Sequence, residues 1–459
     1  MSPLQPLIVL LVAVLATGSA RADVVPDPTA LPPDLSLDKA LEIFHTRGLD
    51  LLIAEANTRN AEGAVVIAGA VPNPTLSATV GNAFTYANTA SSQQNCLQNG
   101  AVCSPWTNNL TISDSAAITD TLSGKRDLRM RVARNALAAA KMQRVDAERT
   151  LELQVKQAYV LVAQAKRAEK FARDVAESQV TTLKKFRARA QIRGGAISEG
   201  DLERVEVQKL EADQAVDAAA QTLRQARVAL AFLLGVRGVV PDFEIDTAVL
   251  DYTVPARLVG ATEATLLREA FAKRPDLAAL GYQRQQAREQ VRLVRRQRLP
   301  DLTFGLGYSF GGFGGYSTNG PIQGQTLSVS LSLPLPVFYS LQGEQRQAHA
   351  QLDLASLQEA KQTAQVASDI ANGLAAFATN RRLVERMEGP RRDGGGLLES
   401  AHGAFIHTEQ LYDKGNASLT DYLDALRQYI ATKNEYFGDL ASYWTAVFEI
   451  EAAVGGNLR

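Results

Sequence analysis

The spacing of apolar and polar residues changes period several times along the chain. Between residues 37 and 71 apolar positions recur every three or four residues, which predicts one helix that Pro72 ends. Over residues 75–86 the period becomes two, which predicts a strand of about 12 residues. A polar loop follows, and residues 110–119 alternate again, interrupted only by Asp114. The first part of the chain is therefore expected to form a helix and two strands.

The second half of the chain repeats the alternation more clearly. Residues 302–310 and 327–335 place aliphatic and aromatic side chains on one face and Ser, Thr and Gly on the other. A small soluble sandwich with one buried face has this pattern. A membrane barrel has it too, because its strands of about 9 to 11 residues carry apolar side chains outside and polar ones inside. In the barrel interpretation the lipid-facing residues are Leu302, Phe304, Leu306, Val329 and Leu331.

If the strands form a barrel, several copies of the chain must contribute to it. Even the smallest single-chain barrels have about eight strands, whereas this chain has four alternating segments. Several copies of the chain would have to close the ring together, and three copies would supply twelve strands.

Long helical segments fill most of the remaining chain. Residues 126–193 contain no helix breaker and are rich in Ala, Lys, Arg, Gln and Glu, which is typical of a long solvent-exposed coiled helix. At 1.5 Å per residue this helix is roughly 100 Å long. Residues 199–234 are expected to form the returning helix. The second half has the corresponding segments 262–299, 343–414 and 418–454, and the glycines and proline within 389–396 must bend or break the longest of them.

Two sharp helical hairpins connect these segments. Gly195, Ser198 and Asp201 recur as Gly415, Ser418 and Asp421, 220 positions later. In each copy the Gly suits the left-handed residue that ends a helix, and the Ser is placed to accept a backbone hydrogen bond at the start of the next helix.

The hairpins belong to a duplication of the whole chain. Pro74 and Leu76, at the start of one strand, correspond to Pro300 and Leu302, 226 positions later. Each repeat is expected to contain a helix, two strands and a long helical hairpin. We predict a signal peptide over residues 1–22, an N-terminal extension over 23–36, a first repeat over 37–240, a connection over 241–261 and a second repeat over 262–459.

The beginning of the chain predicts export. Residues 7–16 are apolar, and residues 20–22 read Ala-Arg-Ala, the small-x-small pattern that precedes signal-peptidase cleavage. The apolar run is shorter than the roughly 20 residues that a membrane-spanning helix needs. In an oxidising compartment Cys96 and Cys103 favour a loop disulfide over a metal pair, because a closed metal site needs about four ligands and no His lies nearby.

Composition and motifs exclude other classes of function. The 48 basic and 49 acidic residues nearly balance, which argues against a nucleic-acid binder. The four histidines have no Cys or carboxylate at a metal-ligand spacing such as His-Glu-x-x-His, and the Gly-rich runs do not open a helix with a phosphate-binding pattern. We therefore predict no enzyme and no cofactor.

Together these features resemble the TolC-like outer-membrane efflux protein family. The resemblance rests on the two Pro-x-Leu strand starts, the Leu-Pro-Leu-Pro-Val-Phe run at 333–338 and the two Gly-x-x-Ser-x-x-Asp hairpins. These motifs are spread over nearly all of the mature chain. The resemblance implies a mainly α-helical fold with membrane β structure. A homotrimer would form a twelve-stranded barrel in the outer membrane of a Gram-negative bacterium, and the barrel would continue into a coiled-coil tunnel across the periplasm.

The resemblance also implies partners and a function. The chain would be a passive exit duct that works with a periplasmic adaptor (membrane fusion) protein and an inner-membrane pump of the resistance-nodulation-division (RND) type, surrounded by outer-membrane lipid. Pro336-Val-Phe followed by Leu341-Gln-Gly-Glu resembles the branch that serves heavy-metal cation pumps, which makes metal cations a candidate cargo. The alternative is a soluble periplasmic coiled-coil scaffold or adaptor whose strands pack as a small sandwich.

In this family, acidic rings just after the second hairpin constrict the closed periplasmic end. Asp421 and Asp424 match those positions. Three residues apart on a helix, they share one face, so threefold symmetry would stack two rings of carboxylates, which favour cations. A purely structural role for Asp421 stays open, because Ser418 and Asp421 have the spacing of a capping box. Asp201 is a weaker match, because its next-turn neighbour is Arg204.

The hairpins are also where an adaptor would contact the tunnel. The residues concerned are Gly195, Ser198, Asp201, Gly415 and Ser418. Simple helix reversal explains the Gly and Ser residues equally well, and both roles could hold together.

Overall fold

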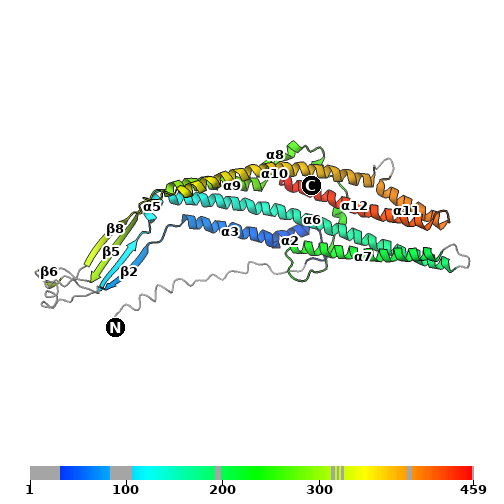
Figure 1. The fold of residues 1–459 in the computed structure, drawn as a ribbon, viewed down its shortest axis with the longest axis horizontal. Coiled ribbons are helices and arrows are strands. Elements are labelled where there is room, and N and C mark those ends of the chain that lie inside the picture. Colours follow the sequence, from blue (N-terminus) through cyan, green and yellow to red (C-terminus); the bar gives the residue numbers. More distant parts are fainter. Residues whose placement is uncertain are drawn as a thin grey trace, which may run out of the picture. The chain divides into compact units, whose positions relative to one another are not determined.

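The computed structural model describes residues 31–82, 106–191, 198–311, 316–317, 320–321, 325–389 and 395–456 (Figure 1). The chain divides into two compact units, and each takes segments from both halves of the sequence. The hairpin unit comprises Met1–Leu49, Gln154–Tyr252 and Val384–Thr445. The strand unit comprises Asp50–Leu153, Thr253–Leu383 and Ala446–Arg459.

The hairpin unit is almost entirely helical. Its main elements are α2 (Leu37–Arg47), the second part of α6 (Lys125–Ala190), α7 (Glu199–Leu233), α11 (Leu397–Asp413) and most of α12 (Leu419–Val454). Two short strands, β1 (Asp34–Leu35) and β4 (Glu244–Ile245), pair in parallel, and the turn η1 (Thr247–Leu250) follows β4.

A buried tyrosine of α6 fastens this strand pair to the helices. The Tyr159 hydroxyl donates to the Leu35 carbonyl at 2.9 Å and accepts from the Asp246 N–H at 3.1 Å. Burial raises the pKa of Tyr159 to about 12.

The strand unit holds the antiparallel sheet, whose four strands lie side by side in Figure 1. The strands are β2 (Thr75–Asn82), β3 (Trp106–Ser113), β5 (Thr303–Gly311) and β8 (Gln325–Ser332), in the order β2-β3-β5-β8. The other elements are α3 (Leu49–Gly69), α5 (Ala117–Leu122), the first part of α6, η2 (Ala256–Leu258), α8 (Glu263–Lys273), α9 (Pro275–Gln297), most of α10 (Gln342–Glu388), the last part of α12 and the small pair β6 (Tyr316–Ser317) and β7 (Gly320–Pro321). Among the described residues, none of the helices combines the length and the apolar character needed to cross a bilayer.

The prediction of single helices over 37–71 and 262–299 is wrong, because each segment is two helices. The first breaks at Gly48, between α2 and α3, where the Gly48 N–H still bonds to the Phe44 carbonyl but the backbone leaves the helical region. The second breaks before Pro275, the first residue of α9, because Pro disfavours helical backbone in the residue that precedes it.

Both breaks contact the glycine that ends the returning helix of the same repeat. Gly235, just after α7, has φ of 78°, and a Cβ there would lie 2.6 Å from the Arg47 carbonyl oxygen. Gly455, just after α12, has φ of 77°, and a Cβ there would lie 3.6 Å from the Arg274 Cα. Corresponding positions of the two repeats therefore make corresponding contacts.

The prediction that residues 110–119 form one strand is also wrong, since β3 ends at Ser113. The Asp114 carboxylate accepts hydrogen bonds from the N–H groups of Phe304 at 2.8 Å, Ala116 at 3.1 Å and Ile118 at 3.4 Å. These bonds turn the chain out of the sheet and start α5. The expected break in the segment 343–414 is confirmed, because α10 ends at Glu388 and α11 begins at Leu397. The residues 83–86 of the predicted first strand lie outside the described residues.

Candidate functional site

The strand register aligns the apolar side chains of all four strands on one face of the sheet. One row consists of Leu76, Ile112, Leu306 and Val329, and the next consists of Ala78, Leu110, Tyr308 and Leu327. The large side chains of both rows are exposed, from 40% for Tyr308 to 80% for Val329. Among the described residues, this face of the sheet is therefore apolar and exposed.

The opposite face is lined by small polar residues and glycine. Its rows are Ser77, Thr111, Gly307 and Ser328, and Thr75, Ser113, Gly305 and Ser330. The hydroxyls of Thr75 and Ser113 are hydrogen bonded at 2.7 Å. A Cβ on Gly305 would lie 2.4 Å from the Ser330 Oγ, so glycine in β5 leaves room for the serine side chain of β8.

Four of the five residues predicted to face lipid lie on the apolar face. Phe304 and Leu306 belong to β5, Val329 and Leu331 belong to β8, and all four are exposed. Leu302 precedes β5 and is half-buried, and its carbonyl accepts a hydrogen bond from the Thr119 hydroxyl at 2.8 Å. That lipid covers this face stays a prediction.

The second hairpin, between α11 and α12, is closed by backbone hydrogen bonds and a side-chain cap. Gly415 has φ of 76°, and its N–H donates to the Tyr412 carbonyl at 2.9 Å. The Ser418 hydroxyl and N–H both donate to the Asp421 carboxylate, at 2.7 and 3.0 Å, and the Asp421 N–H donates to the Ser418 Oγ at 3.1 Å. The bonds from Ser418 hold the pKa of the Asp421 carboxyl below its usual value.

One turn further along α12, Asp424 makes weaker contacts. Its side chain is 67% exposed, and the nearest cation is Arg427 on the same helix, with Nη1 3.7 Å from the carboxylate. Arg427 also lies 3.9 Å from Glu211 of α7. Asp421 and Asp424 are both exposed near the beginning of α12, and at this spacing they share one face of the helix.

The first hairpin differs from the second. Ser198 caps α7 by accepting from the Asp201 N–H at 3.1 Å. The Asp201 carboxylate lies 3.9 Å from Arg204, the arginine that the sequence places one turn away. Gly195 lies outside the described residues, as do Cys96 and Cys103, so the adaptor role of this glycine and the disulfide stay predictions.

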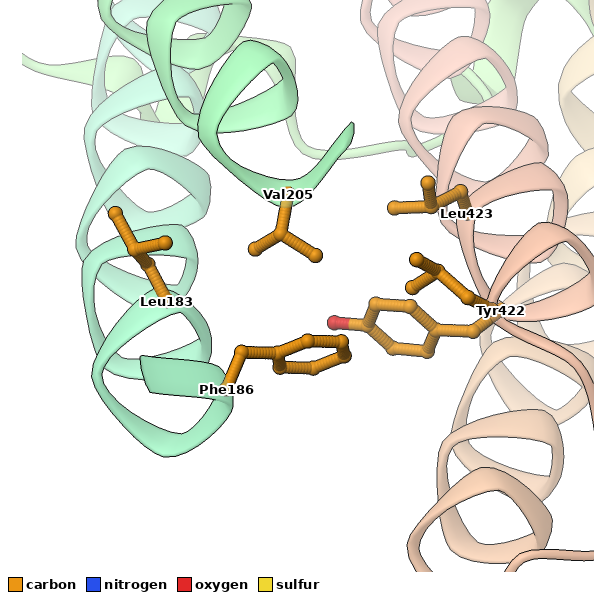
Figure 2. Close-up of a cluster of buried hydrophobic side chains, with 6 residues drawn as sticks. Leu183, Phe186, Val205, Tyr422 and Leu423 are labelled. Atoms are coloured by element: carbon orange, nitrogen blue, oxygen red, sulfur yellow. The ribbon is translucent and has the colours of Figure 1, made fainter. Parts of the chain in front are cut away.

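Behind the hairpins, a cluster of buried side chains joins α6, α7 and α12 (Figure 2). Its members are Leu183, Phe186, Val205, Leu419, Tyr422 and Leu423. Figure 2 shows Tyr422 extending from α12 toward Phe186 of α6. The Phe186 ring also stacks on Tyr412 of α11, with 5.4 Å between ring centroids. The two hairpins therefore share one apolar core.

An ion pair that local sequence patterns do not predict connects these hairpins. Arg189, in the last turn of α6, binds Asp413, the last residue of α11, at 2.9 Å. These residues are 224 positions apart, and no local pattern links two charges over such a separation. The cluster and this ion pair both hold the second hairpin against α6.

Comparisons with known proteins agree with this geometry. Residues 266–456 match the family described as outer membrane efflux protein. The cobalt-zinc-cadmium resistance protein CzcC of Cupriavidus metallidurans is 23% identical over 439 residues, which are 96% of this chain and 94% of the relative. Among solved structures, CusC has a TM-score of 0.70 at 15% identity and covers 96% of this chain and 99% of its own. The CmeC outer membrane channel of Campylobacter jejuni has a TM-score of 0.71 at 18% identity, with 92% and 85% covered.

Proposed function

We propose that this chain is an outer membrane efflux protein and the exit duct of a tripartite efflux system, and the family match of residues 266–456 supports this proposal. The uncovered apolar face of the sheet supports this proposal most directly. Residues such as Leu76 and Val329 alternate with small polar residues across all four strands, as required of strands with lipid on one side and a water-filled lumen on the other. The duct is passive and catalyses no reaction.

The proposed channel is a homotrimer with a twelve-stranded barrel. The described sheet is open, with β2 and β8 as its two outer strands. Unpaired backbone groups at such edges cannot remain in a lipid environment, because each would lack a hydrogen-bond partner. Pairing of β8 in one copy with β2 in the next satisfies both edges, and three copies close the ring.

Asp421 and Asp424 are the proposed periplasmic gate. Threefold symmetry would bring three copies of each exposed carboxylate around the axis and produce two rings that attract cations. The name of the relative, a cobalt-zinc-cadmium resistance protein, agrees with metal cations as cargo. In this proposal the hairpins meet a periplasmic adaptor, which connects the duct to an inner-membrane pump of the RND type.

The alternative, a soluble periplasmic scaffold with a strand sandwich, is less well supported. A sandwich must bury one face of its sheet inside the protomer. Here the apolar face is exposed, whereas the buried residues Gly305 and Gly307 lie on the opposite face, which is lined by small polar residues.

Cell fractionation followed by mass determination tests the proposal. The mature chain should be found in the outer membrane and should have the mass of three copies after extraction in detergent. A periplasmic monomer that is soluble without detergent would overturn the channel and restore the scaffold.

A further inference from the structure

Two connections that lead from the sheet to the helices leave large apolar side chains uncovered. After β8, the segment 333–338 continues the apolar positions of the strand, and Leu335, Val337 and Phe338 are exposed, Phe338 completely. Its two prolines keep the segment out of both helix and strand. It therefore extends the apolar face of the sheet beyond the last strand residue.

The connection after β3 has the same property. Helix α5 exposes Ile118 and Leu122, which are four residues apart and so lie on one face; Leu122 is 82% exposed. The helix is fixed on its other side, because the Asp120 carboxylate receives two hydrogen bonds of 2.6 Å from Arg129 of α6. Ile118 and Leu122 therefore lie on a helix that the contact of Asp120 with Arg129 holds against α6.

Unpaired arginines accompany these apolar residues. Arg296 and Arg298 lie at the end of α9 and Arg346 lies in the first turns of α10. All three are exposed, and within the described ranges none has a hydrogen bond or ion pair through its side chain. A hydrogen bond of 3.2 Å between Arg295 and His349 places the end of α9 beside the beginning of α10.

Other arginines in the same helical turns are paired. Arg292 binds Glu289 at 2.6 Å, and Arg295 contacts His349. The unpaired arginines are therefore those closest in sequence to the strands, with four residues between Arg298 and the first residue of β5.

We propose that these arginines and the neighbouring apolar residues form a collar that binds anionic phospholipids of the periplasmic leaflet of the outer membrane. The inference rests on the proposed function, in which this end of the sheet meets the periplasm. Guanidinium groups bind phosphate through paired hydrogen bonds, and apolar and aromatic side chains enter the boundary between headgroups and acyl chains. Phe338, Leu122 and their neighbours supply the apolar part of this pattern.

Charge favours lipid over a second copy of the chain as the partner of this collar. If the collars of three copies packed against one another, nine guanidinium groups would be buried beside other positive charges. Burying charges without partners of opposite sign is costly. A layer of lipid phosphates supplies the missing opposite charge.

The test uses trimers of the full mature chain in detergent, titrated with phosphatidylglycerol or phosphatidylcholine while the midpoint of thermal unfolding is recorded. We expect the wild type to be stabilised more by phosphatidylglycerol. The variant R296Q/R298Q/R346Q should lose this preference, with apparent affinity falling about fivefold for each arginine removed. High salt should reduce the preference as well. Replacing Phe338 by Ser should weaken the binding of both lipids.

The matched control, R59Q/R224Q/R268Q, removes three other exposed arginines, Arg59 of α3, Arg224 of α7 and Arg268 of α8, whose side chains have no hydrogen bond or ion pair to any described residue. Its net charge equals that of the collar variant, and it should keep the preference. The collar would be overturned if both variants lost the preference for phosphatidylglycerol equally, or if the wild type showed no such preference. A fall in the trimer yield of the collar variant that neither lipid changes would also overturn it. Failure of the wild type to form a trimer would instead overturn the proposed function.

Discussion

The side chains of Ser418 and Asp421 cap the start of α12 reciprocally. The Ser418 hydroxyl donates to the Asp421 carboxylate at 2.7 Å, and the backbone N–H of each residue donates to the side chain of the other. The capping role of Asp421 is therefore present, yet its carboxylate remains exposed. Capping and a place in an acidic gate ring are compatible.

The pH dependence of cation selectivity should change when Ser418 is replaced by Ala. Hydrogen bonds from Ser418 lower the pKa of Asp421, so Asp421 stays ionised to a lower pH than an ordinary aspartate. The stability from this contact is present above the unfolded pKa, about 3.9, and is lost as pH falls through the lower folded value. In S418A the pKa should rise, so reversal potentials in planar bilayers should lose cation preference at a higher pH. An unchanged midpoint would show that Asp421 does not set selectivity.

Replacing both Asp421 and Asp424 by Asn should weaken cation preference in single-channel recordings at neutral pH. The change removes six carboxylates from the proposed trimeric gate while it keeps side chains of similar size. Asp201→Asn is the matched control at the first hairpin, and it should leave selectivity almost unchanged. If the double variant selects cations as strongly as the wild type, the gate lies elsewhere.

An arginine on the apolar face of the sheet should prevent trimer assembly. Leu306→Arg and Leu331→Arg each place a charge where lipid is proposed, at a cost of about 2 to 4 kcal/mol near the middle of a bilayer. Thr326→Arg is the control, because Thr326 pairs with Ser309 on the polar face. Semi-native gel electrophoresis of membrane extracts should show trimers for the control and little or none for the leucine variants. Normal assembly of all three would contradict the barrel.

Alanine should be tolerated far better at Gly415 than at Gly235, although both glycines have φ near 77°. Gly415 has open space around a Cβ, so Gly415→Ala adds only backbone strain of about 1 to 2 kcal/mol. At Gly235 the new Cβ would also lie 2.6 Å from the Arg47 carbonyl oxygen, which should add about 1 to 3 kcal/mol. Thermal unfolding midpoints of the two variants should therefore differ by about 1 to 3 °C, with Gly235→Ala lower. Equal midpoints would mean that α2 moves away from Gly235 at little cost.

The sequence by itself determined the features that depend on neighbouring residues. Alternation over 302–310 and 327–335 predicts strands and assigns Leu306 and Val329 to one face, because the side-chain period of a strand is two. Gly415 and Ser418 predict the hairpin, because the conformations and hydrogen bonds involved span only a few residues. The family resemblance came from the order of such local motifs along a duplicated chain, and the match to outer membrane efflux proteins agrees with it.

The tertiary structure decided what depends on residues far apart in the chain. Asp114 ends β3 early because its carboxylate binds the backbone of Phe304, 190 positions away. Contacts between distant residues also produce the ion pair of Arg189 with Asp413. They align the row of apolar side chains that runs across four strands from Leu76 to Val329. Such contacts depend on which distant segments meet when the chain folds, and periodicity contains no information about that meeting. The sequence could therefore predict the faces of the strands, but only the folded chain showed which residues lie opposite one another.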